Sequence, residues 1–214
     1  MDIEAVKAKL VSQGWTYDQD EFLGQVFNEY FWKMIGDVQV YLQPYMRKMD
    51  EGRIEFSLGP AISTQEFQDV RNYVMQESFP REFILARYAW RCMAPETETK
   101  YPETEFSEIT DKVFDEMLES SLEWARCQDV EKALEYYANL STNQFERTIA
   151  KHLAALVIRG EKEKLLYYQK CFAEGNRLDF VPYVTDEAIN RALELVMKKS
   201  ETFLPKVWKI FIGR

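Results

Sequence analysis

The sequence predicts an α+β protein with an N-terminal helix and an antiparallel β-meander with covering helices, followed by a larger all-helical bundle. Alternating apolar and polar segments separated by turn signals occupy residues 30–58, whereas from residue 107 onward apolar residues recur at helical spacing. The chain has 214 residues, of which 46% are hydrophobic and 14% aromatic. That composition is too apolar for a disordered chain and suffices for a sizeable core.

Residues 2–13 are predicted to form an amphipathic helix. Asp2 can cap its start and Gly14 can end it, after which Trp15 is expected to fold back onto the apolar side. Four apolar residues share that side: Ile3, Val6, Leu10 and Val11.

Residues 17–35 allow two interpretations. Phe22, Val26 and Tyr30 fit a helical period, but residues 30–35 are rich in aromatic side chains and end at Gly36-Asp37, a hairpin signal. We favour a short helix or loop followed by a strand from about Tyr30. Residues 38–42 and 54–58 also alternate as strands do, so the three segments predict a meander.

The meander must bury its apolar face against helices. A capping box at Ser63-Thr-Gln-Glu66 predicts a helix over residues 63–77, and this helix and the first one are the candidates to cover the sheet. A further helix is predicted over residues 81–93.

Residues 94–106 contain Pro-Glu-Thr-Glu twice and few apolar side chains, which is typical of a linker. We therefore expect an α+β part over residues 1–93 and an all-helical part over residues 107–214. The two parts can also pack as one domain.

The second part is predicted to be helical nearly throughout. We expect residues 143–158 to lie at its centre, because residues 153–158 are apolar on every side and such a helix is normally surrounded by others. Ser141 or Thr142 can cap that helix, and Gly160 can end it. The other helices are predicted over residues 108–126 (with Ser107 as the cap), 129–140, 161–174 and 186–199, while residues 203–212 fit either a helix or a strand.

Two segments of the helical part resemble each other. Residues 129–137 and 160–168 both end in Leu-x-Tyr-Tyr, at an offset of 31 residues. Tetratricopeptide repeats have a similar period of about 34 residues, but at least about three copies are usually needed for stability. A plain helical bundle is therefore the better interpretation.

The sequence contains no recognisable catalytic or ligand motif. Its single histidine, His152, has no acidic residue three or four positions away, so we expect a packed residue and not a catalyst or metal ligand. Asp18 and Asp20 are spaced like the start of a calcium loop, but the glycine and final glutamate of that motif are missing. We predict no catalytic residue, no metal and no cofactor.

Charge and cysteine content limit the possible partners and the compartment. The formal net charge of −9 repels nucleic-acid backbones. The three cysteines form no Cys-x-x-Cys pair, which indicates free thiols in a reducing compartment. No signal peptide and no membrane-spanning stretch are visible, so we expect a cytoplasmic protein that binds neither nucleic acid nor membrane.

The negative charge is concentrated in one segment. Residues 96–123 contain ten acidic residues and two lysines, a net charge of −8. Close carboxylates repel one another, so a basic protein that binds them could recover this cost. The alternative is a solvated helix face that keeps the protein soluble. We predict a docking surface for a basic protein partner at six residues, Glu108, Asp111, Asp115, Glu116, Glu119 and Glu123.

In size, acidity and lack of active-site motifs, the whole chain resembles small acidic bacterial immunity proteins of toxin systems. That resemblance implies a non-catalytic protein, monomeric or weakly dimeric, that binds a basic toxin such as a nuclease and blocks its active site with the acidic segment. Two alternatives remain open. One is a chaperone or adaptor for a secreted protein, and the other is an enzyme with carboxylates in a cleft between the two parts.

Overall fold

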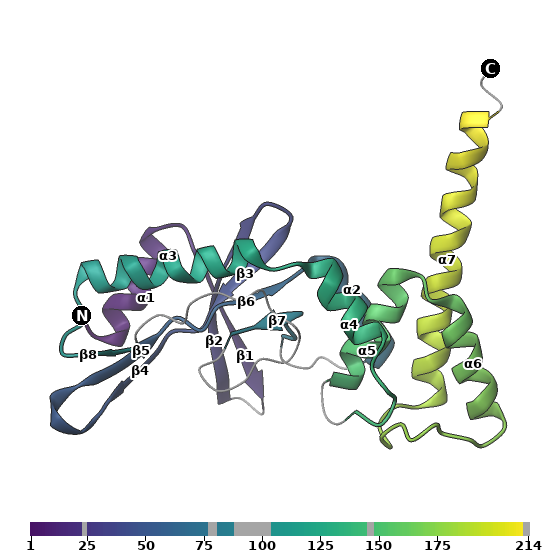
Figure 1. Ribbon diagram of the computed structural model, residues 1–214, viewed down its shortest axis with the longest axis horizontal. Helices are drawn as coiled ribbons and strands as arrows, with labels where there is room; N and C mark the ends of the chain where they lie inside the picture. Colours follow the sequence, from purple (N-terminus) through teal and green to yellow (C-terminus); the bar gives the residue numbers. More distant parts are fainter. Residues whose placement is uncertain (23–24, 77–80, 88–103, 145–147, 212–214) are drawn as a thin grey trace. The chain divides into compact units, whose positions relative to one another are not determined.

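The computed structural model confirms the α+β class, with an N-terminal helix, antiparallel strands in two sheets, and then several helices (Figure 1). It describes the chain except residues 23–24, 77–80, 88–103, 145–147 and 212–214, and it describes only the backbone of residues 21–22, 27 and 200–211. The chain forms two compact units. Unit 1 comprises Met1–Thr64 and Pro80–Val130, and unit 2 comprises Gln65–Phe79 and Glu131–Arg214.

The first helix, α1 (Ile3–Ser12), begins and ends as predicted. The carboxylate of Asp2 accepts a hydrogen bond from the backbone N–H of Ala5, which is the expected cap. Gly14 follows the helix with a φ of 82°, and Trp15 is buried. The backbone N–H of Trp15 donates to the carbonyl of Leu10 at 3.1 Å, which keeps the chain close to the end of the helix. That the Trp15 side chain folds back onto the apolar side of α1 stays a prediction.

The larger sheet of unit 1 has the strand order β1-β2-β3-β6-β7. Its strands are β1 (Thr16–Phe22), β2 (Gln25–Ile35), β3 (Val38–Leu42), β6 (Ala61–Ser63) and β7 (Leu85–Ala86). The predicted hairpin is confirmed, because Ile35 pairs with Val38 across the two-residue turn Gly36-Asp37. The prediction of a short helix or loop before Tyr30 was wrong. Residues there pair as a hairpin, with Tyr17 opposite Phe31, and cross-strand packing outweighs the local helical spacing.

A second sheet contains β4 (Tyr45–Lys48), β5 (Ile54–Ser57) and β8 (Glu105–Phe106) in the order β4-β5-β8. The prediction that residues 54–58 join the meander was therefore wrong. The short 3₁₀ turn Asp50–Gly52 returns β5 onto β4, its neighbour in sequence, and sequential strands usually pair.

The helix predicted over residues 81–93 was wrong for its described part. Leu85 and Ala86 form β7, which pairs with β6, and the six residues 82–87 are all buried. A segment covered on both faces loses the alternation that marks a strand, so periodicity could not identify it. Residues 88–93, and residues 94–103 of the expected linker, lie outside the described residues, so that boundary stays a prediction.

Helices α1 and α3 (Asp111–Cys127) pack with the larger sheet in unit 1. Lys7 of α1 binds Glu29 of β2 at 2.7 Å, and α3 contacts β3. The helix predicted over residues 108–126 is confirmed, but its cap is Thr110 and not Ser107. The Thr110 hydroxyl accepts a hydrogen bond from the N–H of Val113 at 3.3 Å.

Unit 2 is helical and organised around α5 (Thr148–Arg159). Nine consecutive residues, from Ile149 to Val157, are buried, and α5 contacts the helices α2 (Gln65–Met75), α6 (Lys162–Ala173) and α7 (Asp186–Phe211). The predicted central helix is confirmed, although it begins at Thr148, after residues 145–147 that lie outside the description. Gly160 follows it with a φ of 73°, as the predicted ending requires.

Helix α2 belongs to unit 2, where it packs with other helices, and its expected covering of the sheet stays a prediction. Its Tyr73 hydroxyl donates to Glu194 of α7 at 3.0 Å, and Arg191 of α7 donates to the carbonyl of Val74 at 2.8 Å. The buried side of α2 packs with α5 and α7, because an apolar helix face is satisfied by any complementary apolar surface.

Candidate functional site

The six predicted docking residues lie at one side of α3 and just before it, and we call them the acidic face. All six side chains are exposed. The opposite side of α3 is buried through Phe114, Met117, Ser121, Trp124 and Ala125. Because an α-helix turns by about 100° per residue, these two sets fall on opposite sides. The structure therefore brings the predicted residues together.

Cations of the same chain occupy part of the acidic face. Lys9 of α1 binds Asp111 at 2.7 Å and Asp115 at 3.0 Å. The hydrogen bond to Asp111 raises the pKa of Lys9, and the same bond lowers the pKa of the Asp111 carboxyl. Lys9 therefore already neutralises part of the negative charge at this end of the acidic face when no partner is bound.

The other end carries weaker compensation. Glu116 lies 3.7 Å from Lys112 one turn away, and Glu119 lies 2.8 Å from Arg126. Among the residues that the structure describes, no lysine or arginine forms an ion pair with Glu108 or Glu123. At this end of the acidic face, Glu123 is therefore the carboxylate with the least compensation among the described residues.

The acidic face has a geometry suited to binding and unsuited to carboxylate catalysis. Acid–base chemistry needs two carboxyl groups that converge on a substrate in a cleft. Here all six side chains lie exposed on the outside of a helix whose buried side faces the core. Such a surface can attract and orient a cation-rich partner.

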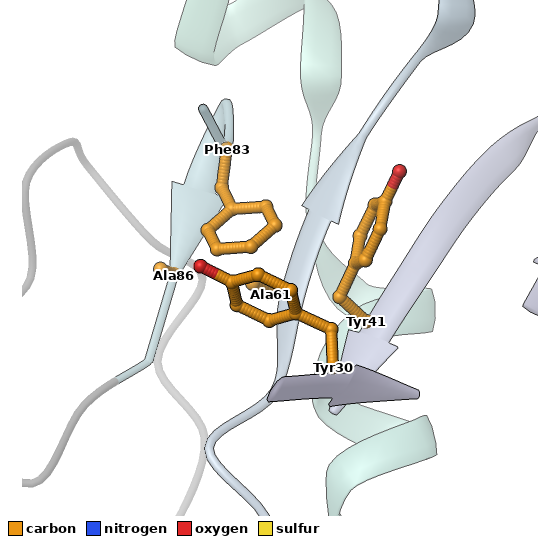
Figure 2. Packing of buried hydrophobic residues seen from close by; sticks show 5 residues of the cluster. All are labelled: Tyr30, Tyr41, Ala61, Phe83 and Ala86. Carbon is orange, nitrogen blue, oxygen red and sulfur yellow. The ribbon is translucent and has the colours of Figure 1, made fainter. Parts of the chain in front are cut away.

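A second polar cluster, which sequence reasoning missed, lies beside the aromatic core of unit 1. Figure 2 shows Tyr30, Tyr41 and Phe83 packed together with Ala61 and Ala86. The Tyr30 ring lies 5.4 Å from Phe83, and the Tyr41 ring lies 5.0 Å from it.

Charged groups join this aromatic core to β1. Arg81 forms an ion pair with Asp18 and donates to the Tyr41 hydroxyl at 3.1 Å. The Tyr30 hydroxyl donates to Asp20 at 2.8 Å. Asp18 and Asp20 are spaced like the start of a calcium loop, but here they bind the side chains of Arg81 and Tyr30. Only the fold could reveal this, because Arg81 lies some 60 residues away in the chain.

We expect Asp18→Asn to lower the free energy of unfolding by about 1–2 kcal/mol, since it leaves the half-buried Arg81 without its carboxylate partner. Urea unfolding measures the loss. Asp37→Asn, in the β2–β3 turn, is the matched control and should change stability by less than about 0.5 kcal/mol. Equal effects of the two substitutions would show that the ion pair contributes nothing.

His152 is fully buried in unit 2 and bound on both ring nitrogens. Nδ1 lies 2.8 Å from the Tyr137 carbonyl, which can only accept, so Nδ1 carries the proton. Nε2 then accepts from the Tyr168 hydroxyl, 3.1 Å away. Burial lowers the pKa of His152 to about 4 and raises the pKa of Tyr168 to about 12. Both groups are neutral and packed, as expected for a structural histidine.

The two Leu-x-Tyr-Tyr segments meet at this histidine. Tyr137 on α4 (Val130–Ala138) and Tyr168 on α6 are the last residues of the two segments, and both contact His152. The internal similarity is therefore the one sequence signal for this cluster, and its cause is a shared contact with His152 and not a repeat array.

Unit 2 also has a groove of about 500 Å³ between α6 and α7. A hydrogen bond of 2.7 Å joins Gln169 and Asn190 of its lining. Within the described part of the chain, no group of three or more histidine, cysteine or acidic side chains could hold a metal ion. The helices described there include none long and apolar enough to cross a bilayer.

Comparison with known proteins gives one match. Neither a curated protein nor a solved structure matches the chain. A family model described as a family of unknown function, DUF6990, matches residues 2–197, which include α1, both sheets, the acidic face and most of unit 2. The chain therefore belongs to the DUF6990 family of unknown function.

Proposed function

We propose that the protein is a non-catalytic binding module that docks a basic protein partner on the acidic face of α3, in the manner of an immunity protein that neutralises a toxin. The observation that carries the proposal is the exposure of all six carboxylates opposite the buried side of one helix. We also propose that this binding takes place in the cytoplasm, because free thiols such as Cys127 and Cys171 are typical of a reducing compartment.

The ion pairs on the acidic face indicate how a partner would bind. Lys9 holds Asp111 and Asp115 from one side, so the partner's cations would engage mainly Glu116, Glu119 and Glu123. Displacing Arg126 from Glu119 costs little, because exposed ion pairs contribute about 0–1 kcal/mol. The partner would thus bind chiefly at the C-terminal half of α3.

Reversing the charge of this half tests the proposal. We expect the triple variant Glu116→Lys, Glu119→Lys and Glu123→Lys to weaken partner binding at low salt, on the order of tenfold or more, and to reduce its salt dependence. The partner would be isolated on immobilised protein, purified and titrated calorimetrically against both forms.

A control with the same change of net charge separates a docking site from general electrostatics. Glu135, Glu163 and Glu174 are exposed on or beside α4 and α6, and their reversal to Lys also changes the net charge by +6. Binding that survives this control and is lost in the first variant supports the proposal. Unchanged affinity of the first variant at low salt, or equal losses in both, would exclude the acidic face.

A further inference from the structure

The smaller sheet of unit 1 has an edge strand with open backbone groups. Among the described strands, β4 pairs with β5 alone, whereas β5 also pairs with β8 on its other side. The β4–β5 hairpin lies at the lower left of Figure 1. A strand in this position presents N–H and C=O groups to which another chain can add as a strand.

The register of the hairpin shows which backbone groups face outward. The N–H of Met49 donates to the carbonyl of Arg53 at 2.8 Å, which marks these residues as a hydrogen-bonded pair. Such pairs alternate along an antiparallel ladder, so the backbone groups of Met46 and Lys48 point away from β5. We call these groups, together with the side chains of residues 45–48, the β4 edge.

The opposite side of the same sheet shows which kind of segment this hairpin binds. The N–H of Phe56 donates to the carbonyl of Thr104 at 2.8 Å, and Glu105 and Phe106 pair with β5. The guanidinium of Arg53 forms an ion pair with Glu105 at 3.0 Å. Backbone hydrogen bonds and an arginine of the hairpin thus hold an extended acidic segment there.

The β4 edge carries the same type of side chain. Arg47 is 60% exposed and forms an ion pair at 2.9 Å with Glu55, which lies opposite it on β5. Because a guanidinium has five N–H donors, Arg47 can bind a second carboxylate on its outer side. Lys48 is exposed and forms no ion pair within the described part of the chain. The β4 edge is therefore locally cationic.

We propose that the β4 edge binds an extended acidic segment of a protein partner, which joins the sheet as an added antiparallel strand. The partner residues opposite Arg47 and Lys48 are acidic in this arrangement. The residue opposite Met46 falls on the same side of the sheet as the buried Phe56, so an apolar side chain is favoured there. Backbone hydrogen bonds supply the affinity, and the side chains supply the specificity.

Charge argues against a second copy of β4 in this place. Antiparallel pairing with Met46 opposite Lys48 would set Arg47 opposite Arg47 of the other copy, and a shift by two residues would set Lys48 opposite Lys48. Like charges directly opposite each other destabilise a strand pair. The register with Met46 opposite Met46 avoids both contacts, but it places Pro44, which has no N–H, opposite Lys48. The proposal is independent of the acidic face, which attracts basic partners.

Titration of the full chain with a synthetic peptide, followed by amide NMR spectra, tests the proposal. The probe is the blocked peptide Thr-Glu-Glu-Val-Tyr-Thr, whose glutamates would lie opposite Lys48 and Arg47 and whose valine would lie opposite Met46. We expect the amide signals of Met46 and Lys48 to shift and their hydrogen exchange to slow. The peptide Thr-Gln-Gln-Val-Tyr-Thr should bind about fivefold more weakly at low salt, because it forms neither ion pair.

Two methylated forms of the probe separate strand addition from charge attraction. In the expected register the valine N–H points toward β4, whereas the N–H of the second glutamate points away from it. N-methylation of the valine should weaken binding about tenfold or more, since it removes a hydrogen bond and sets a methyl group against the edge. N-methylation of the second glutamate is the matched control and should leave binding nearly unchanged.

Variants of the protein test the same contacts. Met46→Pro should also weaken binding about tenfold or more, and the fold should be retained because an edge strand tolerates proline where its N–H faces outward. Lys48→Glu should weaken binding about fivefold at low salt. Lys170→Glu changes the charge equally on α6 in unit 2 and should have no effect. Circular dichroism verifies that each variant is folded.

Amide signals of Met46 and Lys48 that stay unchanged at millimolar peptide would overturn the proposal. Equal losses for the two methylated peptides, or equal effects of Lys48→Glu and Lys170→Glu, would also overturn it. A concentration-dependent dimer that shifts the same two amide signals without peptide would overturn it in favour of self-association.

Discussion

Lowering the pH from 7 to 4 is expected to remove about 3 kcal/mol of stability from unit 2 through His152 alone. The pKa of this side chain is about 4 in the folded protein and 6.5 in the unfolded chain. Each pKa unit of difference is worth about 1.4 kcal/mol. Between pH 6.5 and pH 4, His152 is protonated in the unfolded state but stays neutral in the native state. The free energy of unfolding therefore falls as the pH falls from 6.5, and the loss levels off below pH 4.

The reason for the low pKa is local. Burial disfavours the imidazolium, and the nearby Lys164 adds repulsion, while the bond to the Tyr137 carbonyl opposes both. A proton on Nε2 would also remove the acceptor for the Tyr168 hydroxyl. Protonation would thus strain the contacts that join α4, α5 and α6.

Urea unfolding of the wild type and of His152→Gln at pH 7 and pH 4.5 measures this effect. Carboxylates also protonate in this range, but they do so in both proteins, so the difference between the two pH dependences isolates the histidine. Tyr168→Phe is a second control that keeps the titrating ring. Parallel losses in the wild type and in His152→Gln would contradict the expected low pKa.

Truncation of Trp124 to Ala is expected to lower the free energy of unfolding by about 3–5 kcal/mol, the largest effect in unit 1. Trp124 is the largest fully buried side chain of the protein's described residues and lies on the core side of α3. Its removal leaves a cavity that the neighbouring side chains cannot fill.

The adjacent residue is the matched control. Glu123→Ala changes the exposed side of the same helical turn and should shift stability by less than about 0.5 kcal/mol. Chemical denaturation followed by circular dichroism measures both variants, because replacing a tryptophan alters the fluorescence signal. A loss below about 1 kcal/mol for Trp124→Ala would mean that α3 is not anchored by this side chain.

Together, Trp124→Ala and Glu123→Ala distinguish a residue that stabilises the fold from a residue that binds a partner. Trp124→Ala should weaken a partner's binding only through loss of the fold, whereas Glu123→Ala should weaken binding while the fold stays intact. This separation matters because the same helix carries both a core side and the acidic face.

Local sequence features identified several elements because their causes are local. Asp2 caps α1 through an N–H three residues away, and Gly36-Asp37 makes the turn between β2 and β3. The exposed side of α3 followed from helical spacing, which also placed the six carboxylates together. For the same reason, the acidic face is the part of the candidate site that the sequence could predict.

Only the tertiary structure decided which cations meet those carboxylates. Lys9 reaches Asp111 from α1, about 100 residues earlier in the chain, and no spacing rule connects the two. Likewise Arg81 meets Asp18, and Tyr137 and Tyr168 enclose His152. These contacts depend on how separate elements pack.

The errors in strand and helix assignment have the same origin. Apolar residues such as Phe22, Val26 and Tyr30 have a helical spacing, but they lie in the paired strands β1 and β2, because β2 supplies cross-strand partners that no window of β1 contains. The helix α2 was correctly predicted, but spacing along the chain could not show that its apolar side packs on α5 and α7. By itself the sequence determined which surfaces are apolar, charged or capped, since those depend on neighbours along the chain. The tertiary structure decided which of those surfaces meet. Burial of any two complementary apolar surfaces is favourable, so the pairs that form depend on how all the elements pack together.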